Sequence, residues 1–398
     1  MPYLFTQTPR YDPTAWLEGR DRFPAGATLE LVVGETHRVL VPEFYATADA
    51  TVSDDGHRVL FSAKPTRFSR WQIWEVALSG GAPQAIAREN TECIRPLYLP
   101  DHKVVYTRVG PKNSAITVAG KPVTFAPGRY LTDEVLEDGR ILFESGRGGH
   151  REIFTVYPDG TGVESLRCDH GPDRGEARQL ASGDYVFRAG NRLARFTSAL
   201  ATQTDVNQPN GEAIGPVAEI AQGEWLLSMR GKAGFGLYRW SAPDRQTTPV
   251  ETLTNASAVD PVIVESRTPP REFPSALVPT RTAGNLLCLN ARISRTPIRG
   301  AAVRAVRVYT EGGRLGETGV EPDGSFYVQV PADRPLRIET VDAAGRTVEA
   351  EHGWFWMRPS EQRICVGCHT GPERAPENKV PEILLRTILP VRMLEVKP

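Results

Sequence analysis

The chain has 398 residues, of which 40% are hydrophobic and 24% are charged, as in soluble globular proteins, and it is long enough for two domains. Its 47 Lys and Arg residues and 48 Asp and Glu residues leave a net charge of −1, which gives no electrostatic basis for binding nucleic acid or an anionic membrane surface. The 36 Gly and 33 Pro residues disfavour long helices, and no apolar run could span a bilayer. We therefore expect an all-β protein without a membrane span.

An apolar strand, a tight turn and a second apolar strand recur along the first two thirds of the sequence. The turns carry Asp-Gly or an equivalent pair, which supplies the positive φ that a two-residue hairpin turn needs. Five copies at intervals of roughly 37 to 46 residues match the period of propeller blades. The copies are Val52–Phe61, Leu97–Tyr106, Val135–Phe143, Gln179–Phe187 and Ile220–Leu227.

A sixth blade would begin at Ala258–Val264 and be completed by N-terminal strands such as Leu29–Val33. Strands from both ends of the segment would then share one sheet, and the ring would have no open edge. We therefore predict that residues 1–270 form a six-bladed TolB/WD40-like β-propeller, with five or seven blades as alternatives. An array of β-sandwiches is a further alternative, but the even spacing favours the ring.

After the repeats, Ser266–Pro279 is rich in proline and is expected to be extended, and we place the linker at residues 271–280. Residues 281–350 contain several apolar runs, and Gly316–Pro331 alternates apolar and polar residues around an Asp-Gly turn. We predict a small β-domain here, which resembles the Ig-like sandwich of carboxypeptidase regulatory-like domains.

In the C-terminal segment, 351–398, the chain reads Cys365-Val366-Gly367-Cys368-His369. Two thiols three positions apart can form thioether bonds to a haem, while the adjacent imidazole reaches its iron. We therefore predict one covalent haem c held by Cys365, Cys368 and His369. A zinc corner is one alternative, although no second CxxC or HxxxH supplies a fourth ligand. A redox CxxC is another, but it would open a helix after a strand.

Two tryptophans precede the motif at alternate positions of a predicted strand. Trp354 and Trp356 would point to the same face, where we expect them to contact the haem, with core packing of the β-domain as the alternative. The second axial ligand stays open among Met393, Met357 and His352, and a haem without such a ligand would have an open iron site.

Three further cysteines, Cys93, Cys168 and Cys288, are most simply buried and inert thiols. Cys93 and Cys168 fall in propeller segments. One of them would join a zinc site with His369 if that imidazole does not bind iron.

A propeller followed by a β-domain and the run Trp356–His369 resembles the alpha subunit family of hydrazine synthase. The resemblance implies a covalent haem at the motif, a tyrosine iron ligand just downstream and a zinc nearby. The position four after the motif histidine is Glu373, so the tyrosine is not matched, and no second haem motif follows. The resemblance therefore implies a diverged, single-haem relative.

The expected function is a haem-dependent oxidoreductase that acts on a small nitrogenous or peroxidic molecule at an open iron, together with a redox partner or other subunits of a complex. The alternatives are a six-coordinate electron-transfer cytochrome whose propeller docks a partner, and a non-catalytic binding module in which the motif residues bind zinc. Haem c implies a periplasmic or extracytoplasmic location. Residues 1–16 do not resemble a secretion signal, so we expect the leader to have been removed.

Overall fold

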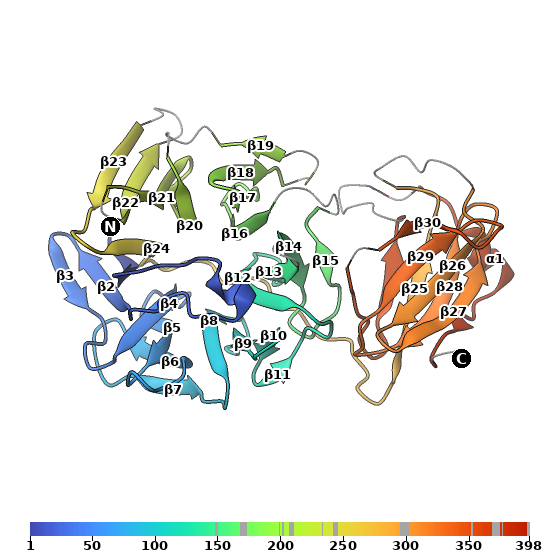
Figure 1. Ribbon diagram of the computed structural model, residues 1–398, viewed down its shortest axis with the longest axis horizontal. Coiled ribbons are helices and arrows are strands. Elements are labelled where there is room, and N and C mark those ends of the chain that lie inside the picture. Colours follow the sequence, from blue (N-terminus) through green and yellow to red (C-terminus); the bar gives the residue numbers. More distant parts are fainter. Residues whose placement is uncertain are drawn as a thin grey trace. The chain divides into compact units, whose positions relative to one another are not determined.

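The computed structural model describes residues 1–398 except 148–149, 168–172, 199, 201–202, 207–210, 233, 242–245, 295–301, 352, 368–374, 376 and 396–398. The described chain is nearly all β, as predicted, and forms two compact units (Figure 1). The first comprises residues 1–122, 128–154 and 172–273, and the second comprises residues 123–127, 155–171 and 274–398. None of the helices in the described ranges has the length and apolarity to cross a bilayer.

The described strands before residue 264 form six four-stranded sheets. One sheet joins β24 (Ser257–Ile263) to β1 (Tyr3–Thr8), β2 (Thr28–Val33) and β3 (Thr36–Val39). The next two sheets are β4 (Ala46–Val52), β5 (Arg58–Lys64), β6 (Gln72–Ala77) and β7 (Gln84–Ala87), then β8 (Glu92–Tyr98), β9 (Val104–Val109), β10 (Ser114–Val118) and β11 (Lys121–Pro122). A 3-10 helix, η1 (Ala15–Glu18), lies between β1 and β2.

The other three sheets follow the same pattern of consecutive strands. They are β12 (Arg129–Val135), β13 (Ile141–Arg147), β14 (His150–Val156) and β15 (Glu164–Ser165); β16 (Arg174–Gln179), β17 (Tyr185–Ala189), β18 (Arg192–Phe196) and β19 (Gln203–Asp205); and β20 (Ala213–Ala221), β21 (Glu224–Arg230), β22 (Phe235–Ser241) and β23 (Gln246–Glu251).

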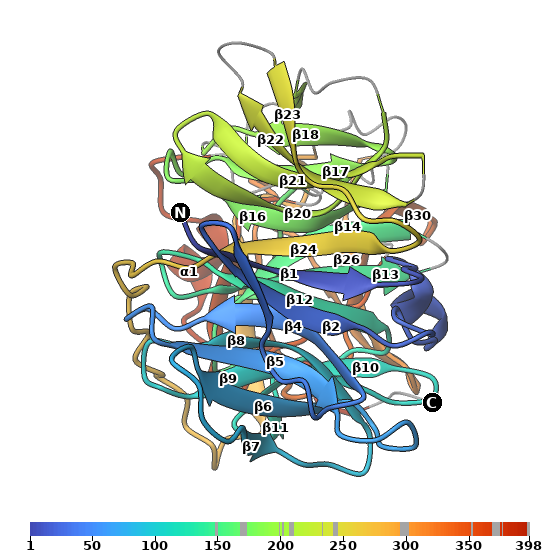
Figure 2. The same ribbon diagram turned by 90° about the vertical axis from the view of Figure 1, so that its left-hand side faces the viewer.

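The innermost strands of these sheets form a closed ring. β4 contacts β8, β8 contacts β12, and the series continues through β16, β20 and β24 back to β4. Strand β24 pairs antiparallel with β1, and the two lie side by side in Figure 2. The structure thus confirms the predicted β-propeller, and N-terminal strands complete the sheet of its last strand as the sequence indicated.

Charged residues interrupt several of the innermost strands. Asp49, Arg95 and Asp260 have φ of 59°, 54° and 52°, and the pairing register of each strand shifts at that point. The Arg22 Nη2 atom lies 2.5 Å from the Asp49 carboxylate, and Arg95 Nε lies 3.6 Å from it. Both guanidinium groups lie 4.0 Å from Asp260. We call these four buried residues the axial charge cluster.

The segment that directly follows β24 is hydrogen-bonded to other parts of the first unit. The Arg267 backbone N–H donates to the Asp54 carbonyl oxygen, and the Arg271 N–H donates to the Glu137 carbonyl oxygen, each at 2.9 Å. A Cβ at Gly139, whose φ is 85°, would lie 2.2 Å from the Arg271 carbonyl oxygen. Glycine is therefore needed there for the turn and for the close approach. The first unit ends at residue 273, whereas the predicted linker begins at residue 271.

In its described residues, the second unit contains two four-stranded sheets and one short helix, α1 (Glu382–Arg386). Strands β26 and β28 alternate buried and half-buried residues, and the sequence pattern predicted this for β28. Apolar residues of both sheets form one shared core, so the arrangement is a sandwich. The sheets have the orders β31 (Gln362–Cys365), β25 (Ala283–Cys288), β28 (Phe326–Pro331), β32 (Val391–Arg392), and β27 (Gly313–Gly319), β26 (Ala305–Thr310), β29 (Arg337–Val341), β30 (Thr347–Ala350).

Candidate functional site

The first cysteine of the predicted haem motif, Cys365, ends the edge strand β31. This strand pairs in parallel with β25, where Cys288 lies opposite Cys365. The Cys365 side chain packs partly against the core of the second unit, and burial raises the pKa of its thiol to about 11. The preceding residue, Ile364, is 63% exposed although it is apolar. The sheet edge therefore carries a protonated thiol and an uncovered apolar side chain.

The rest of the motif is described only in part. Cys368, His369 and Glu373 lie outside the described residues. Gly367 is described, and a Cβ there would lie 2.7 Å from the Ile293 carbonyl oxygen. The close approach of this backbone explains why glycine suits the third position of the motif.

The two tryptophans before the motif have different partners. Trp356 is buried, its indole N–H donates to the Gly160 carbonyl oxygen at 2.9 Å, and its ring meets Phe125 edge-on at 6.3 Å between centroids. Trp354 is half-buried, and the Arg337 guanidinium lies 5.6 Å from its ring centroid. Trp356 is thus anchored by protein groups of the second unit, and a haem contact stays a prediction for both rings.

Two charged residues between Trp356 and β31 have little exposed side-chain surface, and they belong to no recognised sequence motif. The side chains of Arg358 and Glu361 are only 16% and 6% exposed, which is unusual for charged groups. A run of charged residues between an aromatic segment and the motif is the signal that could have drawn attention to them.

Both methionines proposed as distal ligands lie in the core of the second unit. Met357 and Met393 are 0% and 2% exposed, and both pack in the apolar cluster shared by the two sheets. A thioether could bind iron only by leaving this core. The third candidate, His352, lies outside the described residues.

The candidate zinc ligand Cys93 lies on β8 inside the first unit. It is fully buried beside Leu60, Ile73 and Tyr106, and burial raises the pKa of its thiol to about 12. Cys168 lies outside the described residues. Within the part of the chain that the structure describes, no group of three or more His, Cys, Asp or Glu residues could hold a metal ion.

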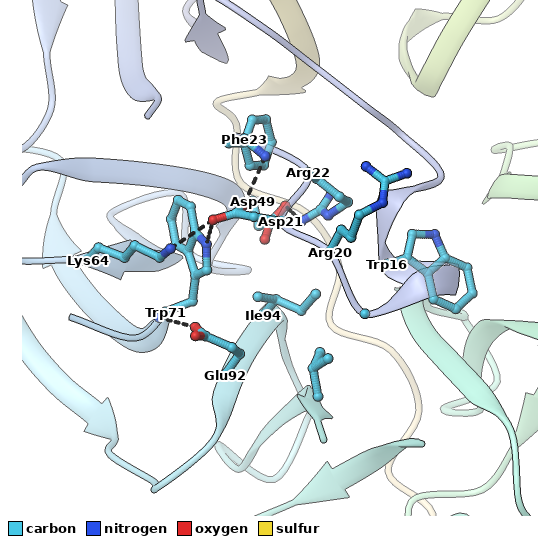
Figure 3. A pocket seen from close by; sticks show the side chains of 12 residues that line it. Trp16, Arg20, Asp21, Arg22, Phe23, Asp49, Lys64, Trp71, Glu92 and Ile94 are labelled. Carbon is cyan, nitrogen blue, oxygen red and sulfur yellow. Dashed lines mark hydrogen bonds and ion pairs between the residues drawn. The ribbon is translucent and has the colours of Figure 1, made fainter. Parts of the chain in front are cut away.

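The first unit also contains a cavity of about 130 Å³ that sequence analysis did not predict (Figure 3). Its Lys64 and Trp71 side chains both donate to Asp21, at 2.8 and 2.9 Å, and Glu92 accepts the Trp71 backbone N–H at 2.5 Å. Since these charged groups already have protein partners, the cavity does not by itself indicate a ligand. Its lining comes from segments far apart in sequence, which explains why no local motif revealed it.

Known proteins are similar to this chain in two respects: the sequence around the motif and the fold as a whole. A family described as the hydrazine synthase alpha subunit middle domain matches residues 296–370. Hydrazine synthase subunit alpha of Kuenenia stuttgartiensis is 35% identical over 66 residues, which make up 17% of this chain and only 8% of that protein. The structure of Kuenenia stuttgartiensis hydrazine synthase covers 97% of this chain and 71% of its own, with a TM-score of 0.82 and 17% identity.

The chain is thus similar to the hydrazine synthase alpha subunit family in its sequence at residues 296–370, and similar to hydrazine synthase in its fold. This confirms the resemblance identified from the sequence. TolB from Acinetobacter baumannii matches with a TM-score of 0.50 and 16% identity over 66% of each chain, which shows a shared propeller fold alone. The matched residues 296–370 include Cys365 and the strand β31 that it ends.

Proposed function

We propose that this chain is a c-type haem protein in which Cys365 and Cys368 bind one haem covalently, with His369 as an axial ligand. The observation that carries the proposal is that the whole CxxCH motif lies within residues 296–370, the part matched by the hydrazine synthase alpha middle domain. When bound, a haem would supply redox chemistry at its iron. We further propose an oxidoreductase acting on a small nitrogenous or peroxidic molecule, with a redox partner or other subunits, in an extracytoplasmic compartment.

The described residues around Cys365 fit such a group. Cys365 ends an edge strand, so the chain beyond it can turn away from the sheet, and the exposed Ile364 offers apolar surface for a macrocycle to cover. Burial raises the pKa of the Cys365 thiol to about 11, so the sulfur carries its hydrogen at neutral pH. A thioether bond would form by adding this S–H across a haem vinyl group, with the sulfur bonding one vinyl carbon and the hydrogen going to the other.

An open iron fits the placement of the two methionines better than an iron ligated by either of them does. Met357 and Met393 are both packed in the core, and removing a methionine from such a position costs roughly 2–5 kcal/mol. This supports small-molecule chemistry over electron transfer through a thioether-ligated iron.

The proposal is tested by expressing the chain, with an export signal, together with a cytochrome maturation system. We expect a coloured protein whose intact mass exceeds that of the polypeptide by one haem, and Cys365→Ser and Cys368→Ser variants without the full attachment. A colourless wild type with the bare polypeptide mass overturns the haem proposal, and stoichiometric zinc in that protein would favour the binding module.

The open iron has its own test. Cyanide added to the oxidised protein, and nitric oxide to the reduced protein, should change the absorption spectrum. No change at any concentration would contradict an accessible iron. A zinc site involving Cys93 or Cys168 stays a further proposal, and unchanged zinc content in Cys93→Ser and Cys168→Ser proteins would refute it.

A further inference from the structure

The turn around Asp159 and Gly160 contacts the segment that leads into β31. The Trp356 indole N–H donates to the Gly160 carbonyl oxygen at 2.9 Å, and Arg358 Nε donates to the Asp159 carbonyl oxygen at 2.8 Å. Gly160 has a φ of 86°, and a Cβ there would lie 2.8 Å from the Val123 carbonyl oxygen. The turn therefore requires glycine both for its backbone and for the closeness of its neighbours.

Arg358 joins three separate parts of the second unit. Besides its bond to the turn, its Nη1 atom lies 2.5 Å from the Asp333 carboxylate, and its guanidinium lies 4.3 Å from the Phe125 ring centroid. The planar guanidinium donates hydrogen bonds from its edge and contacts the aromatic ring with its face, and a lysine ammonium could not make both kinds of contact.

Glu361 joins the same turn to the strand that carries Cys365. Its Oε1 atom accepts the Gly162 backbone N–H at 3.0 Å and Arg363 Nη2 at 2.7 Å, and its Oε2 atom accepts the Arg358 backbone N–H at 2.7 Å. A buried carboxylate with donors on both oxygens is held firmly, because moving it would leave a charge without partners. β31 begins at the next residue, so Glu361 fixes where the strand starts.

We propose that Glu361 and Arg358 are positioning residues, which hold β31 through the turn at 157–162 so that Cys365 stands where it can bind the haem. The haem part of this inference rests on the proposed function. The part that concerns the position of β31 does not rest on the proposed function, because all the contacts that hold the strand are made within the polypeptide.

The rate at which iodoacetamide alkylates Cys365 in the full, haem-free chain reports the position of β31. The thiol is protonated and partly buried while the strand is in place, and loosening the strand exposes it. We expect Glu361→Ala to raise the rate by about tenfold, as local opening becomes easier. Glu361→Gln should have a smaller effect, because it keeps one acceptor oxygen but turns an N–H₂ group toward a donor.

The matched control is Arg346→Met, which removes an ion pair with Asp342 in the same unit from an arginine that is 75% exposed. Its alkylation rate should equal that of the wild type. Trp356→Phe removes the donor to Gly160 and part of the buried ring, and should raise the rate modestly. It keeps the test decisive if Glu361→Ala does not fold. Cys93 should stay unreacted in every folded variant. Equal rates in wild type, Glu361→Gln and Trp356→Phe would overturn the proposal, as would faster alkylation in Arg346→Met.

A second arm measures the fraction of chains that carry haem after co-expression with the maturation system. Glu361→Gln should lower this fraction several-fold, and Arg346→Met should leave it unchanged. Altered alkylation with normal attachment would refute the role in placing Cys365 for haem. A wild type without any haem would refute the proposed function and the haem role together, while the alkylation rates still decide whether Glu361 holds the strand.

Discussion

The first unit places ionised side chains where its innermost strands meet, whereas the second unit fills the space between its two sheets with apolar side chains. In the axial charge cluster, Asp49 faces both Arg22 and Arg95, and all three are buried. In the second unit, Met357 and Met393 occupy the middle of an apolar cluster. Removing one partner of a buried ion pair leaves the other charge uncompensated, but an apolar core tolerates substitutions that conserve volume. The two interiors should therefore respond differently to single changes.

The largest effect is expected from Asp49→Asn. The carboxylate accepts from Arg22 Nη2, from the Ser62 hydroxyl at 2.8 Å and from the Arg95 backbone N–H at 3.2 Å. An amide cannot balance two buried guanidinium charges, so the first unit should lose roughly 3–5 kcal/mol of its free energy of unfolding. Urea unfolding followed by tryptophan fluorescence measures this loss.

The control for that change is Asp12→Asn, which weakens an ion pair with Arg20 whose side chain is 54% exposed. Its effect should stay below about 1 kcal/mol, because exposed ion pairs contribute little. If Asp49→Asn and Asp12→Asn lowered the free energy of unfolding by similar amounts, the ion pairs of the axial charge cluster would contribute no more than exposed ion pairs do.

A smaller effect is expected in the second unit, where the loss of stability should depend on the volume of the side chain and not on its charge. Met357→Ala should lower its free energy of unfolding by roughly 2–5 kcal/mol, since the side chain is fully buried. Met357→Leu conserves volume and should lower it by less than about 1.5 kcal/mol. Thermal unfolding of both variants measures the difference. If leucine destabilised the unit as much as alanine, or altered the spectrum of the haem-loaded protein, the sulfur atom would have a role beyond packing.

In both units, the features that could be predicted from the sequence are those that depend on neighbouring residues. The hairpin turns, such as Asp138-Gly139, follow from local backbone requirements, and the strand repeats follow from alternating apolar residues. The contact of Gly139 with Arg271 joins residues far apart in sequence, so no local signal predicts it. The left-handed conformations of Asp49 and Arg95 could not be predicted from local sequence either, because residues other than glycine adopt them uncommonly and only the ring of strands makes them favourable here.

The candidate site divides in the same way. Cys365 stays a prediction, which the sequence could make because the spacing of two thiols and an imidazole is itself the chemical requirement for haem attachment. The packing of Trp356 against Gly160 was not found, since alternation along a strand says which face a ring occupies but not which distant turn it meets. Glu361 was overlooked for the related reason that charged residues are usually exposed, and only the structure supplies its three donor groups.

The smallest expected effect is a difference in how two buried carboxylates of the first unit, Asp133 and Asp49, make its stability depend on pH. Burial, and then the negative charge of Glu144, raises the pKa of Asp133 well above its ordinary value, although Arg178 and Arg95 oppose this. Burial also acts on Asp49, but Arg22 and Arg95 hold its pKa below the ordinary value. Stability from Asp133 is therefore complete at low pH and is lost as the pH rises through the folded-state pKa, whereas stability from Asp49 is present above the unfolded-state pKa and is lost on acidification.

Asp133→Asn should accordingly raise the stability of the first unit at neutral pH, because the amide carries no charge for burial and Glu144 to disfavour. The gain should shrink as the pH falls, because the wild-type carboxyl then becomes neutral as well. Melting temperatures of wild type, Asp133→Asn and Asp49→Asn across a pH series measure both trends. A destabilised Asp133→Asn at neutral pH would mean that the ionised carboxylate is required by its arginine neighbours, and the buried charges of the first unit would then act as one interdependent set.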